Sequence, residues 1–78
     1  CHLRGMRVDE AVAELERYLE KAYAAGLPYV RIIHGKGSGA VRQAVQEYLT
    51  TSEYVERWEP ALISEGGEGV TVAHLKKI

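Results

Sequence analysis

The chain has 78 residues, of which 46% are hydrophobic and 27% are charged, and its formal net charge is −1. This length allows one domain, the composition excludes a disordered chain, and no run approaches the roughly 20 apolar residues needed to cross a bilayer. The near-neutral charge excludes a generic electrostatic nucleic-acid binder, which is usually strongly basic. Any contact with nucleic acid must therefore come from locally clustered cations or be helped by the rest of a larger protein.

The first element is predicted to be a short strand at residues 1–5. The segment after it has apolar side chains at helical spacing, and Asp9 and Glu10 lie in its first turn, where negative charge suits the helix dipole. The apolar positions are Val8, Ala11, Val12, Leu15, Leu19 and Ala22. Gly26 and Pro28 are typical of the end of a helix, so we expect one amphipathic helix here.

Residues 29–34 are predicted to form a central strand, because they are mostly β-branched or aromatic and show no helical period. A glycine-rich turn follows at residues 34–39, and a second amphipathic helix then runs to about Thr51. The apolar face of that helix consists of Val41, Ala44, Val45, Tyr48 and Leu49.

Two further strands are predicted in the last third of the chain, at residues 54–58 and 70–75, with a polar loop at residues 64–69 between them. The order is βαβαββ, and two right-handed crossovers place both helices on the same face of the sheet. We therefore predict a single domain over residues 1–78, with an α/β fold. It is a two-layer sandwich with a mixed four-stranded sheet. Its first three strands are mostly parallel, the last is antiparallel to the third, and its other face is polar or covered by something else.

Cationic side chains follow the first two predicted strands. Ligands of open α/β sheets bind beyond the carboxyl ends of parallel strands. If the two strands are neighbours, Arg4, Arg7, His34 and Lys36 converge on one edge of the sheet. Arginine can pair bidentately with a phosphate, and histidine can act as a general acid or base. The alternatives are a surface salt bridge for Arg4 and a capping or packing role for His34.

The glycine-rich turn is a second candidate anion site. Gly35, Gly37, Ser38 and Gly39 open directly into the second helix, where free N–H groups and the helix dipole favour a phosphate. The spacing is not that of a Walker A loop, so nucleotide hydrolysis is not expected. The alternative is a tight connection between strand and helix.

The loop before the last strand could reach the same edge through Gly67 and Gly69, or could merely join two strands. Arg42, near the start of the second helix, is a further candidate contact for the nucleic-acid backbone. No pair of carboxylates is spaced for a two-metal site, so we expect weak or no metal dependence, and a divalent metal is left open. One cysteine and three scattered histidines make neither an internal disulfide nor a zinc site.

Three motifs, in this order, resemble those of the Smr (small MutS-related) domain. Leu3-Arg4-Gly5 is similar to the family's opening, and residues 34–39 match its His-Gly-x-Gly-x-Gly signature. Residues 67–72 resemble its glycine-rich ending, of which Gly67, Gly69 and Thr71 match the Gly-x-Gly-x-Thr part. The family usually has an aspartate two residues before the His or Arg of the first motif, and His2 stands there in this chain.

The resemblance implies a fold similar to the C-terminal domain of translation initiation factor three, and endonuclease activity that nicks DNA or cleaves RNA. The chain looks like the version fused to bacterial MutS paralogues, which are associated with restraining recombination or rescuing stalled ribosomes. We accordingly expect a fragment of a larger, dimeric, cytoplasmic protein. The rest of that protein would bind ATP, and no cofactor is expected in this domain.

The leading hypothesis is therefore an endonuclease domain acting on branched or double-stranded DNA, or on RNA or the ribosome. Arg4 and Lys36 would hold the scissile phosphate, His34 would transfer a proton, and Arg7 and Arg42 would contact the flanking backbone. The amides of Gly35, Gly37 and Gly39 would help to bind the phosphate. The alternatives are a non-catalytic DNA-, RNA- or ribosome-binding module and a domain that docks onto protein.

Overall fold

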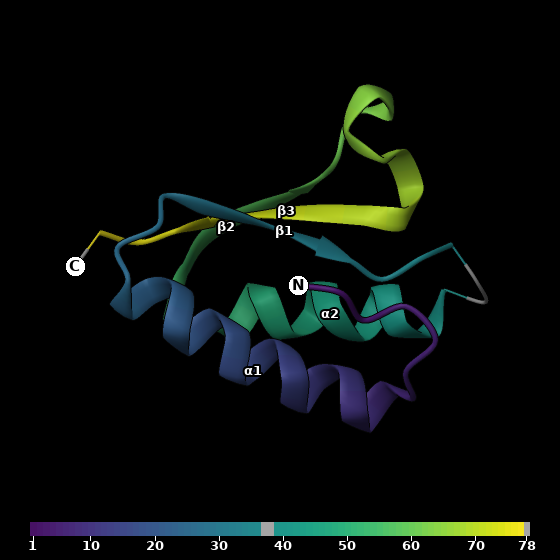
Figure 1. Cartoon of the computed structure of the whole chain (residues 1–78), viewed down its shortest axis with the longest axis horizontal. Helices are drawn as coiled ribbons and strands as arrows, with labels where there is room; N and C mark the ends of the chain where they lie inside the picture. The colour runs from purple at the N-terminus through teal and green to yellow at the C-terminus, as the bar shows by residue number, and fades with distance from the viewer. Residues whose placement is uncertain (37–38, 78) are drawn as a thin grey trace.

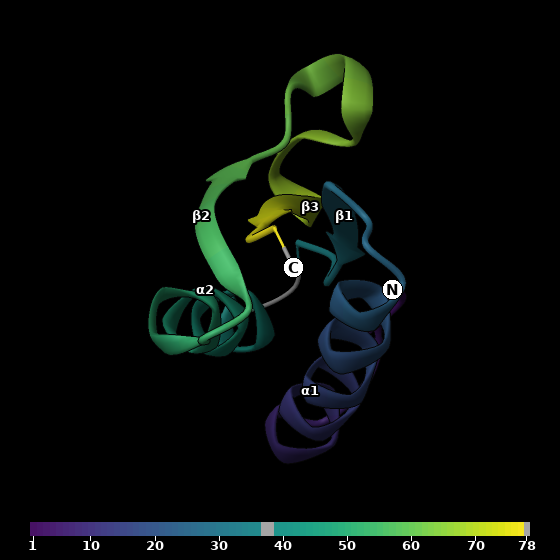
Figure 2. The same cartoon turned by 90° about the vertical axis from the view of Figure 1, so that its left-hand side faces the viewer.

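The structure is a computed structural model that describes residues 1–36 and 39–77. Its elements in chain order are the helix α1 (Val8–Ala24), the strand β1 (Tyr29–Ile33), the helix α2 (Ala40–Thr51), the strand β2 (Val55–Pro60), two 3₁₀ turns (Ile63–Glu65 and Gly67–Gly69) and the strand β3 (Val70–Leu75). Both helices lie on one face of the sheet, as Figures 1 and 2 show, and the other face is open. The predicted two-layer arrangement is thus present.

The sheet differs from the predicted mixed one. Its three strands are ordered β1-β3-β2, and both pairs are antiparallel. β1 and β2 therefore do not pair with each other, because β3 lies between them. β3 takes the central place since its side chains are almost all buried on both faces, whereas β2 is exposed along most of its length. The similarity to the C-terminal domain of translation initiation factor three stays a prediction.

The predicted first strand is reduced to a single parallel bridge between His2 and Ile33. The N–H of Leu3 donates to the carbonyl of Ile33 at 2.7 Å, and the N–H of Ile33 donates to the carbonyl of Cys1 at 2.8 Å. Gly5, with φ +83°, then turns the chain away towards α1. Among the described residues this segment therefore forms one bridge with β1 and no full fourth strand.

The core lies between the sheet and the two helices. α1 contributes Ala11, Leu15, Leu19 and Ala22, α2 contributes Val45 and Leu49, and the strands contribute Val30, Ile32, Val55, Ala73 and Leu75. Leu3, from the bridging segment, is fully buried with them. The predicted faces of both helices are therefore the ones that pack inwards. Val8 is an exception, since it is exposed at the start of α1.

The open face of the sheet is mainly polar and aromatic. His74 and Arg57 both approach Glu59, at 3.1 and 2.8 Å, and the ring of Tyr29 packs beside that of His74. The alternation of buried and exposed residues along β1 fits a sheet covered by helices on one face only.

No helix in the described part of the chain is long and apolar enough to cross a membrane.

Residues 61–69 form a loop that projects from the open side of the sheet, away from both helices (Figures 1 and 2). We call this segment the projecting loop. The N–H groups of Glu65 and Gly67 both donate to the carbonyl of Leu62, at 2.8 and 2.9 Å. The guanidinium of Arg31, on the open face of β1, donates to the carbonyl of Glu65. The loop is thus tied to the sheet at the end where β1 stops and β3 begins.

Candidate functional site

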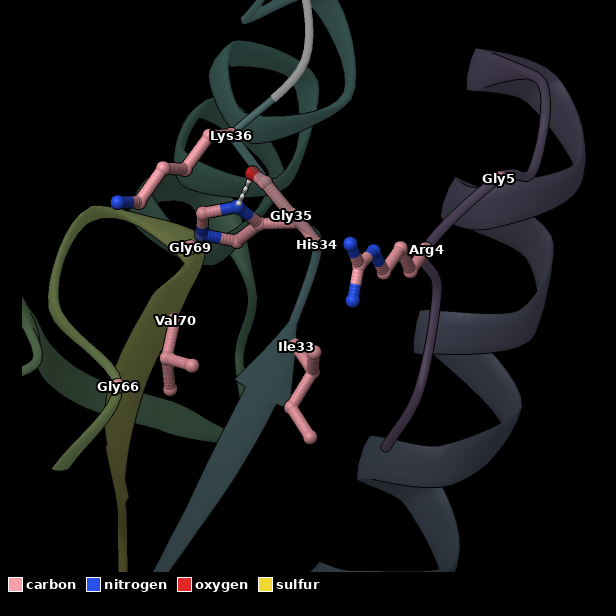
Figure 3. Close-up of a pocket in the computed structure, with 9 residues that line it drawn as sticks. All are labelled: Arg4, Gly5, Ile33, His34, Gly35, Lys36, Gly66, Gly69 and Val70. Atoms are coloured by element: carbon pink, nitrogen blue, oxygen red, sulfur yellow. Dashed lines mark hydrogen bonds between the residues drawn. The ribbon is translucent and has the colours of Figure 1, made fainter.

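A pocket of about 700 Å³ lies at the end of β1 and the start of β3 (Figure 3). Three segments that are far apart in the sequence meet around it. They contribute Arg4 and Gly5, then Ile33, His34, Gly35 and Lys36, and finally Gly66, Gly69 and Val70. These segments contain parts of the three motifs noted in the sequence, so the motifs share one site.

Backbone contacts bring the second and third segments together. The carbonyl of Gly69 accepts hydrogen bonds from the N–H groups of both His34 and Gly35, each at 3.0 Å. A Cβ atom on Gly69 would lie 3.6 Å from the backbone of Gly35, so these two segments of the chain pack closely against each other. Val70 pairs with Ile33 at the first position of the β1–β3 register. The end of the glycine-rich turn is therefore fixed by the start of β3.

Arg4 is positioned by its contact with Gly35. A Cβ atom on Gly35 would lie only 3.2 Å from Cγ of Arg4, so the arginine stem crosses directly over this glycine. Gly35 also has φ +77°, which L-residues with a side chain rarely adopt. Glycine is needed here for two separate reasons, the backbone angle and the approach of Arg4.

The described lining of the pocket carries a net positive charge. Arg4 and Lys36 are exposed, and their side chains form no ion pair or hydrogen bond within residues 1–36 and 39–77. Among the described residues that line the pocket there is no aspartate or glutamate. Figure 3 shows the two cations approaching from opposite sides of His34. Such a pair suits a phosphate.

His34 is held by a hydrogen bond at each ring nitrogen. Its Nδ1 lies 2.9 Å from the carbonyl oxygen of Gly35, and its Nε2 lies 2.7 Å from the hydroxyl of Thr71. A carbonyl can only accept, so Nδ1 carries the proton, and in the neutral ring Nε2 accepts from the Thr71 hydroxyl. His34 is 5% exposed and Thr71 is fully buried. The ring therefore has no free nitrogen facing the pocket.

A smaller depression of about 210 Å³ adjoins the pocket at the start of α2. It shares Gly5, His34, Gly35 and Lys36 with the pocket and adds Met6, Gly39, Val41 and Arg42. Gly39 precedes the helix with φ +85°, and the first turn of the helix has no acidic residue. The positive end of the helix dipole and Arg42 thus extend the cationic surface beside Lys36.

A family model for the Smr domain matches residues 1–76. The chain belongs to the Smr domain family. It is 52% identical over 75 residues to a protein named endonuclease MutS2 from Thermomicrobium roseum. The match covers 96% of this chain and 10% of that protein. The chain therefore spans about a tenth of the length of the curated relatives that it matches.

Solved structures share the fold of this Smr domain. The crystal structure of the Smr domain of Thermus thermophilus MutS2 is 47% identical, with a TM-score of 0.95, and covers 97% of this chain and 95% of that one. YdaL, a stand-alone small MutS-related protein from Escherichia coli, is 32% identical with a TM-score of 0.93, covering 99% of this chain and 63% of its own. The resemblance read from the three motifs is thus confirmed.

The Smr domain brings together most of the residues predicted for the site. Arg4, His34, Gly35, Lys36 and Gly69 line the pocket. The adjoining depression holds Gly39 and Arg42. Gly37 and Ser38 lie outside the residues that the structure describes.

Three expectations about the site are not met. Arg7 immediately precedes α1 and lies outside both cavities, and its guanidinium lies 3.8 Å from the carboxylate of Asp9. Gly67 does not line the pocket either, and its neighbour Gly66 does. The amide of Gly35 is not free for a phosphate, because it donates to Gly69. This hydrogen bond could not be predicted from the position of Gly35 at the end of a strand, because its acceptor is far away in the sequence.

Neither Thr71 nor Gly66 was predicted to have a role in the site. Thr71 is the threonine of the Gly-x-Gly-x-Thr motif, and that motif was the available signal. His2, at the position of the family's aspartate, is exposed and does not line the pocket. Within the described residues, no group of three or more His, Cys, Asp or Glu side chains could hold a metal ion.

Proposed function

We propose that this Smr domain cleaves the phosphodiester backbone of nucleic acid at the pocket beside Arg4 and Lys36. One observation carries the proposal: two cations from different segments, unpaired among the described residues, flank a pocket with no carboxylate in its described lining. In the reaction an oxygen nucleophile bonds to phosphorus, the ester P–O bond breaks, and the leaving oxygen takes up a proton. Fixed cations stabilise the charge that builds on the phosphoryl oxygens.

His34 is the proposed proton-transfer group, and this role requires it to change partner. In the structure its Nε2 is occupied by the Thr71 hydroxyl, so Nε2 must release Thr71 before it can reach a substrate oxygen or a water. Nδ1 can remain on the Gly35 carbonyl, which holds the ring in place. Movement of the Thr71 side chain, or of β3 beneath it, would accompany catalysis.

A nicking assay tests the proposal. The 78-residue chain has its own core and is incubated with supercoiled plasmid and, separately, with single-stranded RNA, each with and without EDTA. Arg4→Gln and Lys36→Gln are expected to lower the rate by about a hundredfold each, because each removes a cation from the developing charge. The EDTA arm shows whether a divalent metal takes part.

The matched control is Lys21→Gln, which removes an exposed cation from the last turn of α1, outside both cavities. It should cleave like the unchanged chain. Equal rates for Arg4→Gln, Lys36→Gln and the unchanged chain would overturn the assignment of this pocket. The His34→Ala variant tests the proton-transfer role separately, since it should abolish cleavage while leaving binding in place.

A second candidate function is a module that binds nucleic acid without cutting it. The observation in its favour is the His34 ring itself, which is buried with both nitrogens bonded within the protein. His34→Asn separates the two functions, because asparagine keeps a donor near the Nδ1 position but cannot act as a general base. The binding module would be favoured if His34→Asn still binds nucleic acid and if neither this variant nor the unchanged chain cleaves it.

For the longer protein we propose the partners expected from the sequence. They are branched or double-stranded DNA, or RNA and the ribosome, together with the remainder of a dimeric, cytoplasmic MutS-type chain that binds ATP. The pocket lining contains no aromatic side chain other than His34, so backbone and shape, instead of base edges, would be recognised there.

A further inference from the structure

Leu62 and Ile63 form an exposed apolar tip on the projecting loop. Leu62 is 66% exposed and Ile63 is 95% exposed. The loop stands clear of the sheet on the side away from the helices (Figures 1 and 2). Two adjacent large apolar side chains at the end of such a loop indicate a surface that another molecule covers.

The tip is already held in shape without a partner. The carbonyl of Leu62 accepts two hydrogen bonds from within the loop, and the N–H of Ala61 donates to the carbonyl of Val70 at 3.0 Å. Arg31 ties the carbonyl of Glu65 to the open face of the sheet. A preformed loop loses little conformational freedom on binding, so its apolar side chains can act as a rigid insert.

The tip also lies close to the cationic pocket. Gly66 lines that pocket, and only Ser64 and Glu65 separate it from Ile63. Three residues span at most about 10 Å. Successive phosphates on one strand lie about 3.4 Å apart along the helix axis, so the tip lies within about three nucleotides of a phosphate held at Gly66.

The carboxylates on the loop and the cations at the pocket favour different parts of a nucleic acid. Glu65 and Glu68 are exposed on the loop, and their carboxylates would repel a phosphate. Arg4 and Lys36 at the pocket attract one. The sugar–phosphate backbone therefore belongs at the pocket, and the apolar tip is left to meet the bases.

We propose that Leu62 and Ile63 act as an apolar wedge that inserts into a base step of duplex DNA, within about three nucleotides of the phosphate at the pocket. Apolar side chains that enter a base step unstack it and kink the duplex, and the cost is lowest where stacking is already weakened. The wedge would therefore direct the domain to distorted duplexes. This inference rests on the proposed nucleic-acid site and adds a preference for substrate.

The test compares two DNA duplexes of the same sequence, one fully paired and one with a single-base bulge flanked by 2-aminopurine. Phosphorothioate linkages around the bulge slow cleavage. The unchanged chain is expected to bind the bulged duplex about tenfold more tightly, equivalent to about 1.4 kcal/mol, and to raise 2-aminopurine fluorescence. The double variant Leu62→Ser/Ile63→Ser lacks the apolar side chains that would enter the base step. It should show less than about a twofold preference for the bulged duplex and no rise in 2-aminopurine fluorescence.

Two variants control for the change in apolar surface. Leu27→Ser removes an exposed leucine from the connection between α1 and β1, at the other end of the sheet, and should behave like the unchanged chain. Ile63→Phe keeps an apolar tip and should keep both the preference and the fluorescence change. Far-UV circular dichroism and the unfolding midpoint check that the double variant is folded.

Equal preference for the bulged duplex in the double variant and the unchanged chain would overturn the wedge. So would a double variant that alters the sedimentation of the protein while leaving DNA binding unaffected, because the tip would then be a surface for self-association. Arg4→Gln should weaken binding to both duplexes without changing their ratio. If the wedge proposal is wrong, cleavage of paired DNA can still be measured. If the cleavage proposal is wrong, the preference for the bulged duplex can still be measured.

Discussion

Gly35 combines a backbone requirement with a packing requirement, and a matched glycine separates the two. Gly26 has nearly the same φ, +75° against +77°, but nothing lies within 4 Å of a Cβ built on it. Alanine at either position should lower the free energy of unfolding by about 1–2 kcal/mol, since each variant places a side chain in the left-handed region. Only Gly35→Ala should also displace Arg4 and weaken nucleic-acid binding.

Urea unfolding and fluorescence anisotropy with a labelled duplex measure these two effects. Gly26→Ala serves as the control for the backbone term and should bind like the unchanged chain. Equal affinity in Gly35→Ala would show that Arg4 does not depend on this contact.

Thr71 is expected to matter because its hydroxyl satisfies a buried nitrogen. Thr71→Val leaves the buried Nε2 of His34 without its hydrogen-bond partner, which should cost about 1–3 kcal/mol of unfolding free energy. Thr71→Ser keeps the hydroxyl and loses only a methyl group. ¹⁵N NMR of the His34 ring should show the Nδ1–H tautomer in the unchanged chain and in Thr71→Ser. A loss of stability that is the same in both variants would assign the effect to packing instead.

The cations of the site could be predicted from the sequence, whereas the residues that hold the site in place could not. Arg4, His34 and Lys36 follow strand ends, and strand ends that neighbour each other bring such residues together. Thr71 could not be placed in the same way, because its contact with His34 depends on β3 lying beside β1. The amide of Gly35 was assigned to a phosphate for the same reason, since its acceptor on Gly69 is 34 residues away in the chain.

At the level of elements, the projecting loop depends on Gly66. This residue has φ +123°, and a Cβ built on it would lie 2.5 Å from Cγ2 of Val70. Its neighbour Gly67 has φ +61°, and nothing lies within 4 Å of its Cβ position. Gly66→Ala should therefore destabilise the domain by about 1–3 kcal/mol, and Gly67→Ala by about 1–2 kcal/mol or less.

Thermal unfolding of the two alanine variants makes the comparison, and the cleavage assay shows whether the pocket wall has moved. Gly67→Ala is the control for flexibility of the loop, because it changes the same segment without a clash. If Gly67→Ala proved the more damaging of the two, the contact between Gly66 and Val70 would not be what fixes the loop.

The elements themselves were predictable to different degrees. Both helices were located by apolar spacing, and the limits of β3 were predicted correctly at residues 70–75. β2 extends to Pro60, two residues further than predicted, because a proline is tolerated on an edge strand. The predicted directions of these strands hold, because β1 and β2 both run antiparallel to β3 and therefore parallel to each other. The place of β3 between them was not predicted, since the crossover rule does not fix the order of the strands. The near-continuous burial of β3 is the property that gives it the central position.

At the scale of the whole molecule, a net charge of −1 limits how much of its binding can be electrostatic. Only Arg4, Lys36 and Arg42 lie at the pocket and the adjoining depression. With two or three phosphates neutralised, the logarithm of the binding constant for duplex DNA should fall against the logarithm of salt concentration with a slope of about −2 to −3. Arg4→Gln should reduce that slope by about 1.

Anisotropy titrations over a range of sodium chloride concentrations give the slope, and Lys21→Gln should leave it unchanged. A much steeper slope in the unchanged chain would mean that a larger cationic surface takes part. An unaltered slope in Arg4→Gln would place the phosphates away from the pocket.

The order β1-β3-β2 has a consequence for how the chain is made. Synthesis produces β1 and β2 first, and neither has its partner strand until residues 70–75 have left the ribosome and inserted between them. Until then two strand edges stay open, which is the condition under which nascent chains associate wrongly. The wall of the pocket at Gly69 and the partner of His34 at Thr71 also arrive last. A nascent or truncated chain that stops before Val70 therefore contains all three cations but has no assembled site, and the domain becomes competent in one late step.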